Sequence, residues 1–149
     1  MKSDGSTPPQ LLQKAPFGIW EAEVSGDGQW LIMRLDEEGF NSNLRVRRLS
    51  GDTAVKPLLV EPAFTLCIAL SRDSHWLAYT SNQSGQYEVY VSSFPDMKSK
   101  RMVSSGGGGE PRWSRDGREL YFVGGGKLMA VAVPPGPTFS PGAPRALFR

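Results

Sequence analysis

The apolar positions of this chain fall into short runs that recur at a nearly constant interval. Three of these runs, 30–33, 76–79 and 120–123, are apolar on consecutive residues, which is typical of strands covered on both faces. Other segments alternate with a period of two residues, as Val89 and Val91 do. Because no segment shows the stripe of a capped helix, the pattern predicts an all-β protein.

Each of these apolar runs follows the same short turn signature, Ser-x-Asp followed by Gly or Ser. The turn aspartates, Asp27, Asp73 and Asp116, lie 46 and 43 residues apart. This interval is typical of a four-stranded propeller blade of about 40 to 45 residues. We expect the positions shared by the copies to be structural: Ser25, Asp27, Gly28, Trp30, Leu31, Ser71, Asp73, Trp76, Leu77, Ser114, Asp116, Gly117 and Leu120.

The second copy of the turn departs from the other two at one position. Ser74 stands where Gly28 and Gly117 stand in the other copies. Glycine accepts a positive φ angle without strain, whereas serine does not. We therefore expect the turn at Ser74 to be the most strained of the three.

The segments around each turn make up a unit of four strands. The strand before the turn is expected at 19–24, 66–70 and 112–113, the third strand at 44–49, 87–91 and 128–133, and the fourth at 58–60, 101–103 and 146–148. Leu11-Leu12 is expected to be an orphan outer strand within a leader of residues 1–16. The prediction is a partial β-propeller of three four-stranded antiparallel blades, at approximately 17–62, 63–105 and 106–149.

Composition and charge add three expectations. With 17 Gly and 12 Pro in 149 residues and no long apolar stretch, the chain has no predicted membrane span. The single Cys67, within Leu66-Cys67-Ile68, is expected to be a small buried hydrophobe. Net charge is −4 over residues 1–96 and +6 over residues 97–149. Two copies related by a two-fold axis would therefore bring opposite charges together in a six-bladed ring.

The hairpin loops between the second and third strands vary most among the blades, at 36–43, 81–86 and 124–127. Variable polar loops on a rigid scaffold are where binding residues concentrate. Glu110 and Arg112 follow the glycine run 106–109 and are expected near the central channel. The candidate binding residues are therefore Asp36, Glu38, Asn41, Asn82, Tyr87, Glu110 and Arg112.

Three more specific kinds of site are disfavoured by their context. The oxygen-rich loop 36–43 fits no calcium-loop spacing, so no metal or other cofactor is expected. The glycine run leads into another strand rather than a helix, which favours a flexible connection over a phosphate cradle. The basic strand at 45–48 lies beside an acidic loop, and this is too weak a footprint for nucleic acid.

Ser71, Asp73 and His75 lie close together in sequence and suggest a catalytic triad. The same Ser and Asp positions recur in the other two turns, where no histidine is available, so a structural role is favoured. A triad is defined by geometry rather than by adjacency in sequence. We expect no catalytic residue and no enzymatic activity.

Several segments resemble a known family of repeats. The Ser-x-Asp-Gly turns, Trp76-Leu77-Ala78-Tyr79-Thr80-Ser81-Asn82, the strand at 85–91 and the stretch 107–120 look like TolB-type, WD-like propeller repeats. More narrowly, they are similar to propellers fused behind bacterial membrane-anchored serine/threonine kinases. The chain lacks the proline of the family's usual Ser-Pro-Asp-Gly turn, and it contains no kinase motif.

The resemblance implies a noncatalytic module that binds a protein, a peptide or a ligand, as the C-terminal part of a larger sensor or kinase-linked propeller. The alternative is an accessory gating propeller of a serine hydrolase or peptidase whose catalytic domain lies outside this chain. Fold alone does not choose between them. The expected location is the cytoplasm if the chain is complete, and outside the cytoplasm if it belongs to a membrane-anchored protein.

Overall fold

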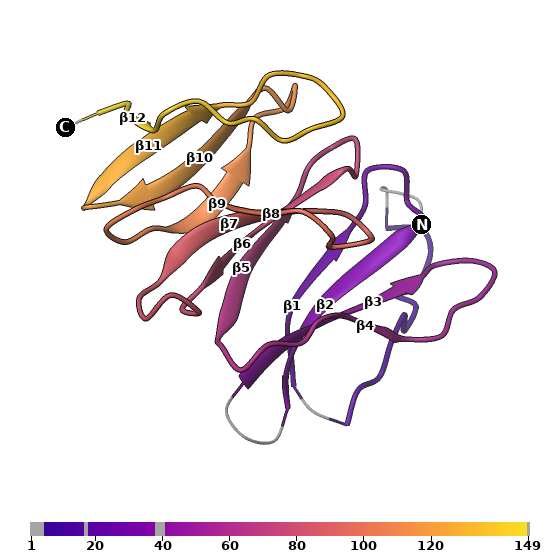
Figure 1. The fold of residues 1–149 in the computed structure, drawn as a ribbon. Helices are drawn as coiled ribbons and strands as arrows, with labels where there is room; N and C mark the ends of the chain where they lie inside the picture. The colour runs from indigo at the N-terminus through magenta and orange to yellow at the C-terminus, as the bar shows by residue number, and fades with distance from the viewer. Residues whose placement is uncertain (1–4, 17, 38–40, 149) are drawn as a thin grey trace.

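The computed structural model describes residues 5–16, 18–37 and 41–148. Its strands form three separate four-stranded antiparallel sheets, each built from consecutive strands, and no helix occurs in these residues (Figure 1). Together they are a partial β-propeller of three blades, as the turn spacing predicts. The part of the chain that is described contains no helix long and apolar enough to cross a membrane.

The three sheets contain twelve strands. Blade 1 contains β1 (Ile19–Val24), β2 (Trp30–Glu37), β3 (Asn41–Arg48) and β4 (Lys56–Leu59). Blade 2 contains β5 (Thr65–Leu70), β6 (Trp76–Ser81), β7 (Glu88–Ser93) and β8 (Lys100–Met102). Blade 3 contains β9 (Gly109–Trp113), β10 (Glu119–Gly124), β11 (Lys127–Ala132) and β12 (Arg145–Ala146).

The turn between the first two strands has the same hydrogen bonds in every blade. In blade 2 the Ser71 hydroxyl donates to Asp73 Oδ1 at 2.6 Å and accepts the N–H of Trp76 at 2.9 Å. The other two turns repeat both bonds, with Ser25, Asp27 and Trp30 and with Ser114, Asp116 and Glu119. The hydroxyl therefore fixes the point at which the second strand begins.

The blades are joined by two apolar layers. Ile32 and Leu44 of blade 1 pack against Leu70 and Tyr79 of blade 2, and Ala78 of blade 2 belongs to a second layer with blade 3. Trp30 and Trp76 lie at these two junctions, as expected, with their rings 5.8 Å from Phe94 and 5.4 Å from Phe139. Blade 2 is covered on both sides, which explains the continuous burial of β6 and β7.

The first blade has a second apolar face, which points away from blade 2. Leu31, Met33 and Leu35 of β2 are buried on this face and pack with Ala15 from the segment that precedes β1. Arg47 Nη1 donates to the carbonyl oxygen of Leu12 at 2.9 Å. The segment before β1 therefore lies across the outer face of blade 1.

The predicted orphan strand at Leu11-Leu12 is wrong. The structure has no strand at these residues, and their side chains are 68% and 50% exposed. A strand needs a partner edge, and the strands expected to pair with Leu11-Leu12 would belong to a preceding blade, which the described residues do not contain. This segment instead follows the surface of blade 1.

Two further expectations differ from the structure. The loop expected at 36–43 is shorter, because β2 continues to Glu37 and β3 resumes at Asn41 with one-to-one pairing. The run 106–109 is not a free connection, because Gly107 N donates to Glu88 Oε1 and Gly108 N to the Tyr87 carbonyl. A β-carbon at Gly108 would lie 2.6 Å from the Ser104 β-carbon, so close packing requires glycine there.

The strain expected at Ser74 is confirmed. Its φ angle is +61°, close to the +68° of Gly28 and the +71° of Gly117, and its buried hydroxyl has no hydrogen-bond partner among the described residues. A left-handed conformation costs a residue with a β-carbon roughly 1–2 kcal/mol.

Replacing Ser74 by glycine is expected to raise the free energy of unfolding by about 0.5–1 kcal/mol, because the strain is relieved and no hydrogen bond is lost. Urea unfolding followed by tryptophan fluorescence measures the change. The matched control is Gly117→Ser, which is expected to lower the same free energy by a similar amount. A Ser74→Gly protein no more stable than the parent would contradict the argument.

Candidate functional site

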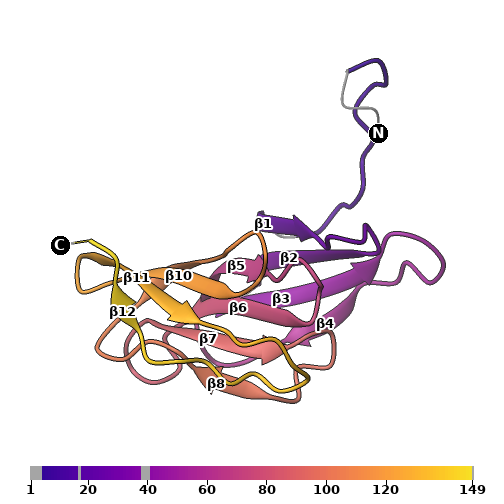
Figure 2. The ribbon, with the colours of Figure 1, turned by 90° about the horizontal axis from the view of Figure 1, so that it is seen from above.

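The first strands of the three blades, β1, β5 and β9, lie side by side at the inner edges of the sheets (Figures 1 and 2). In a propeller this is the side that surrounds the central channel. Each of the three strands contains a β-bulge: between Ile19 and Glu21, between Leu66 and Ala69, and between Gly109 and Arg112. Bulges re-aim side chains and are common beside functional sites.

One position of the repeat recurs at these bulges. Glu21, Cys67 and Glu110 each lie six residues before the aspartate of their blade's turn. Cys67 and Glu110 have φ angles of +54° and +56°, which few residues with a β-carbon adopt. Such strain at an observed position suggests a functional role.

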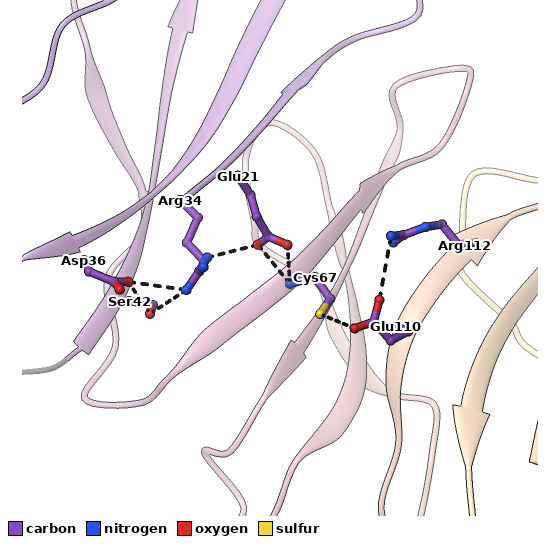
Figure 3. Close-up of polar contacts among 7 residues, drawn as sticks. All are labelled: Glu21, Arg34, Asp36, Ser42, Cys67, Glu110 and Arg112. Atoms are coloured by element: carbon purple, nitrogen blue, oxygen red, sulfur yellow. Dashed lines mark hydrogen bonds and ion pairs between the residues drawn. The ribbon is translucent and has the colours of Figure 1, made fainter. Parts of the chain in front are cut away.

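The side chains of this position form a line of contacts from blade to blade (Figure 3). The Glu21 carboxylate accepts the N–H of Cys67 through both oxygens, at 3.0 and 2.9 Å. The Cys67 thiol in turn donates to Glu110 Oε1 at 3.2 Å, and Glu110 Oε2 lies 3.7 Å from Arg112 Nη2. The three blades are therefore connected through one repeat position.

Arg34 of β2 supports the beginning of this line. Its Nε lies 3.0 Å from Glu21 Oε2, and its Nη1 donates to Asp36 Oδ1 at 3.3 Å and to Ser42 Oγ at 3.2 Å (Figure 3). Its side chain is only 15% exposed. Arg34 thus spans from the hairpin end of blade 1 to the junction with blade 2.

A second carboxylate joins the same two blades. Glu23 Oε1 accepts the N–H of Leu70 at 3.0 Å. Burial raises the pKa of Glu23, while the Leu70 N–H and the charge of Arg112 oppose that rise. Glu21, Glu23 and Arg112 line a hollow of about 350 Å³ that opens at the inner edges of blades 1 to 3.

Cys67 is not the buried hydrophobe that its neighbours in sequence suggest. The bulge turns its side chain out of the apolar layer, so it is half-buried and contacts Glu110. Burial, and then the hydrogen bond to Glu110, raise the pKa of the Cys67 thiol to about 11. Because a thiolate is the reactive form, Cys67 is a poor nucleophile at neutral pH.

The structure places the predicted candidates in different settings. Glu110 and Arg112 lie together at the inner edge, and Tyr87 shares a hollow with Glu110. Asp36 holds Arg34 and Ser42, and Asn82 Oδ1 accepts the Phe64 N–H at 2.8 Å at the start of blade 2. Glu38 and the side chain of Asn41 lie outside the described residues.

The Ser71, Asp73 and His75 side chains do not have the contacts of a triad. The Ser71 hydroxyl donates to Asp73 Oδ1, whereas the His75 ring lies on the other oxygen of the same carboxylate, at 3.2 Å from Nδ1 to Oδ2. Burial disfavours the charge on Asp73, but the Ser71 hydroxyl and the His75 N–H hold its pKa below its usual range. These residues border a hollow of about 670 Å³ at the turn end of blades 2 and 3.

Glu21, Glu23 and Arg34 are not among the candidates predicted from the sequence, because they lie in strands rather than in loops. The signal that points to Glu21 was present, because Glu21, Cys67 and Glu110 have the same spacing from their turns. No pattern in the sequence shows the bulges that aim these side chains along the inner edge.

Comparison with known proteins supports the fold. No family model and no curated protein matches this sequence. TolB from Acinetobacter baumannii has a TM-score of 0.62 at 19% identity, over 74% of this chain and 28% of that one. The putative TolB from Agrobacterium tumefaciens has a TM-score of 0.60 at 19% identity, over 73% of this chain and 40% of that one.

A peptidase contains a similar arrangement of strands. Prolyl oligopeptidase B from Galerina marginata has a TM-score of 0.60 at 13% identity, over 83% of this chain and 21% of that one. This chain spans less than half the length of each of these three proteins. The fold is therefore a partial propeller of the TolB type, and at these identities the likeness concerns the fold alone.

Replacing Glu21 by alanine is expected to lower the free energy of unfolding by about 1–3 kcal/mol, because the Cys67 N–H loses its partner and the largely buried Arg34 loses one of its two carboxylates. Urea unfolding measures the loss. The matched control is Glu119→Ala, which removes a carboxylate of similar side-chain exposure, 30% against 29%, from its exposed partner Arg145. Equal losses in the two variants would contradict a special role of Glu21.

Proposed function

We propose that this chain is a noncatalytic propeller module that binds a protein or a peptide at the inner edge of blades 2 and 3. The proposal rests on a difference between the two blade junctions. At the first junction the carboxylates of Glu21 and Glu23 accept backbone N–H groups of blade 2. At the second, the side chains of Glu110 and Arg112 remain 61% and 62% exposed.

Exposed groups of opposite charge beside an aromatic ring suit an extended peptide. The backbone and side chains of a peptide offer both donors and acceptors, and aromatic side chains supply contact area at interfaces. Tyr87 is 45% exposed and lines the same hollow as Glu110. The proposed binding residues are therefore Tyr87, Glu110 and Arg112, three of the candidates from the sequence.

The module is proposed to act within a larger sensor propeller linked to a kinase. This part of the proposal is supported by the resemblance of the turn and strand motifs to the propellers of such kinases. The second candidate, an accessory gating propeller of a serine hydrolase, is supported by the likeness to prolyl oligopeptidase B. In that case the catalytic centre would lie outside this chain, because the Ser71 hydroxyl contacts Asp73 rather than His75.

Peptides selected from a random display library on the immobilised chain are expected to bind at least tenfold more weakly to Tyr87→Ser, since anchoring aromatic residues dominate interfaces. Fluorescence anisotropy of labelled peptides measures the affinity. The matched control is Met102→Ser, which removes a side chain of similar exposure, 48% against 45%, from the outer strand β8. Failure to select any peptide, or equal loss in both variants, would overturn the proposal.

We also propose that two copies associate so that blade 3 of one packs against blade 1 of the other, at the part around Val24 that the segment before β1 leaves exposed. Leu128 and Val123 of blade 3 are 39% and 47% exposed on its outer face, and Val24 of blade 1 is 48% exposed. Net charge is −4 over residues 1–96 and +6 over residues 97–149, so pairing blade 3 with blade 1 is favoured over pairing two copies of the same blade.

Sedimentation at increasing protein concentration is expected to show a dimer that weakens at high salt and is lost in Leu128→Lys, because a charge would then be buried in the interface. Met102→Lys, which places the same charge on an outer strand, is expected to leave the dimer intact. A monomer at all concentrations, or equal dimerisation of Leu128→Lys, would exclude this mode of association.

A further inference from the structure

The two blade junctions differ at one more repeat position, seven residues after the turn aspartate. This position is Arg34 in blade 1, Thr80 in blade 2 and Val123 in blade 3. At the first junction Arg34 provides a guanidinium that is held by the carboxylates of Glu21 and Asp36 and by Ser42 (Figure 3). The first junction is therefore already occupied by a positively charged side chain of the protein itself.

At the second junction this position carries a much shorter side chain. Thr80 is 2% exposed, and its hydroxyl has no hydrogen-bond partner among the described residues. A buried hydroxyl without a partner costs roughly 1–3 kcal/mol, so a ligand that bonds to it would offset that cost. Thr80 borders a hollow of about 430 Å³ between blades 2 and 3.

The other walls of this hollow suit a cation. Glu110 supplies a carboxylate, and the exposed ring of Tyr87 supplies an aromatic face. A guanidinium over such a ring is favoured by about 0.5–2 kcal/mol. Gly107 borders the hollow without a side chain, and a β-carbon there would meet no other atom within 4 Å, which leaves room for a ligand.

The glycine wall of the hollow is held in place from within the protein. The carboxylate of the buried Glu88 accepts the N–H of Gly107 at 2.8 Å and a hydrogen bond from the Ser104 hydroxyl. The hydroxyl of Ser104 in turn accepts the N–H of Val89 at 2.8 Å. The glycine segment is therefore positioned before any ligand arrives.

We propose that this hollow binds the guanidinium of an arginine side chain from an extended peptide, in the manner in which Arg34 is held at the first junction. The inference rests on the proposed peptide-binding function and specifies a side chain that the peptide supplies. Glu110 and the Thr80 hydroxyl accept hydrogen bonds from the guanidinium. Arg112 is no obstacle, because its 3.7 Å ion pair with Glu110 is long and exposed.

The probes are N-acetyl-arginine amide and N-acetyl-citrulline amide, which have similar shapes but differ in charge. Arginine amide is expected to bind about tenfold more tightly, because a charge-assisted bond to a carboxylate is the stronger one. Two-dimensional NMR titration measures both affinities, with the shifted amide signals expected at 107–110 and around Thr80. The Glu110→Gln variant is expected to bind arginine amide about tenfold more weakly.

Two further variants separate binding from folding. Thr80→Val removes the hydroxyl at nearly constant shape, and it is expected to weaken arginine amide binding about threefold without loss of stability, since no internal bond is broken. Glu119→Gln removes a carboxylate elsewhere on blade 3 and is expected to leave binding unchanged.

Equal affinity for the two amides, or unchanged binding in Glu110→Gln, would overturn the arginine site. A different result would contradict the proposed function, namely that no selected peptide binds more weakly to the Tyr87→Ser variant. Selected peptides that depend on Tyr87 but contain no arginine would refute the inference and leave the function standing.

Discussion

Every blade of this protein depends on one serine hydroxyl that makes two hydrogen bonds at once. It donates to the aspartate two residues later and accepts the N–H five residues later, so the chain reverses and the second strand begins at a fixed point. Because the hydrogen-bonding groups are local in sequence, these bonds can form without contact between the blades. The pKa values of Asp27 and Asp116 are lowered, and the largest cause is the hydrogen bond that the serine of each turn donates to the aspartate. The turn thus stabilises the ionised form of its aspartate.

Because these bonds are local, the features that depend on them can be predicted from the sequence. Features that depend on pairing between strands cannot. The turns, the blades and the strain at Ser74 follow from residue types at fixed spacing. The bulges do not, because a register shift of one residue arises from pairing between strands rather than from composition. Cys67 is the clearest case. Its sequence neighbours are apolar, yet the bulge turns its thiol toward Glu110.

The two junctions show how one repeat supports two kinds of contact. At the first, charged side chains from blade 1 bond to backbone groups of blade 2, as Glu21 does with the N–H of Cys67. At the second, the Trp113 indole donates to the Ala69 carbonyl at 3.0 Å within an apolar layer, and the charged residues Glu110 and Arg112 remain exposed at the inner edge. Blade 1 has Arg34 at the repeat position where blade 2 has Thr80. The first junction therefore contains an internal ion pair, whereas the second contains an open, polar hollow. Small changes at equivalent positions can therefore turn a filled junction between blades into an open one.

The segment that lies across blade 1 also has a consequence for biosynthesis. Residues 12–15 leave the ribosome before β2, so they are available to cover Leu31, Met33 and Leu35 as soon as that sheet forms. The opposite face, with Ile32 and Leu44, must wait for blade 2. At roughly 5–20 residues per second, that delay lasts a few seconds, during which only one side of the nascent sheet is exposed to chaperones and to aggregation. The early segment thus reduces the apolar area that the growing chain must protect.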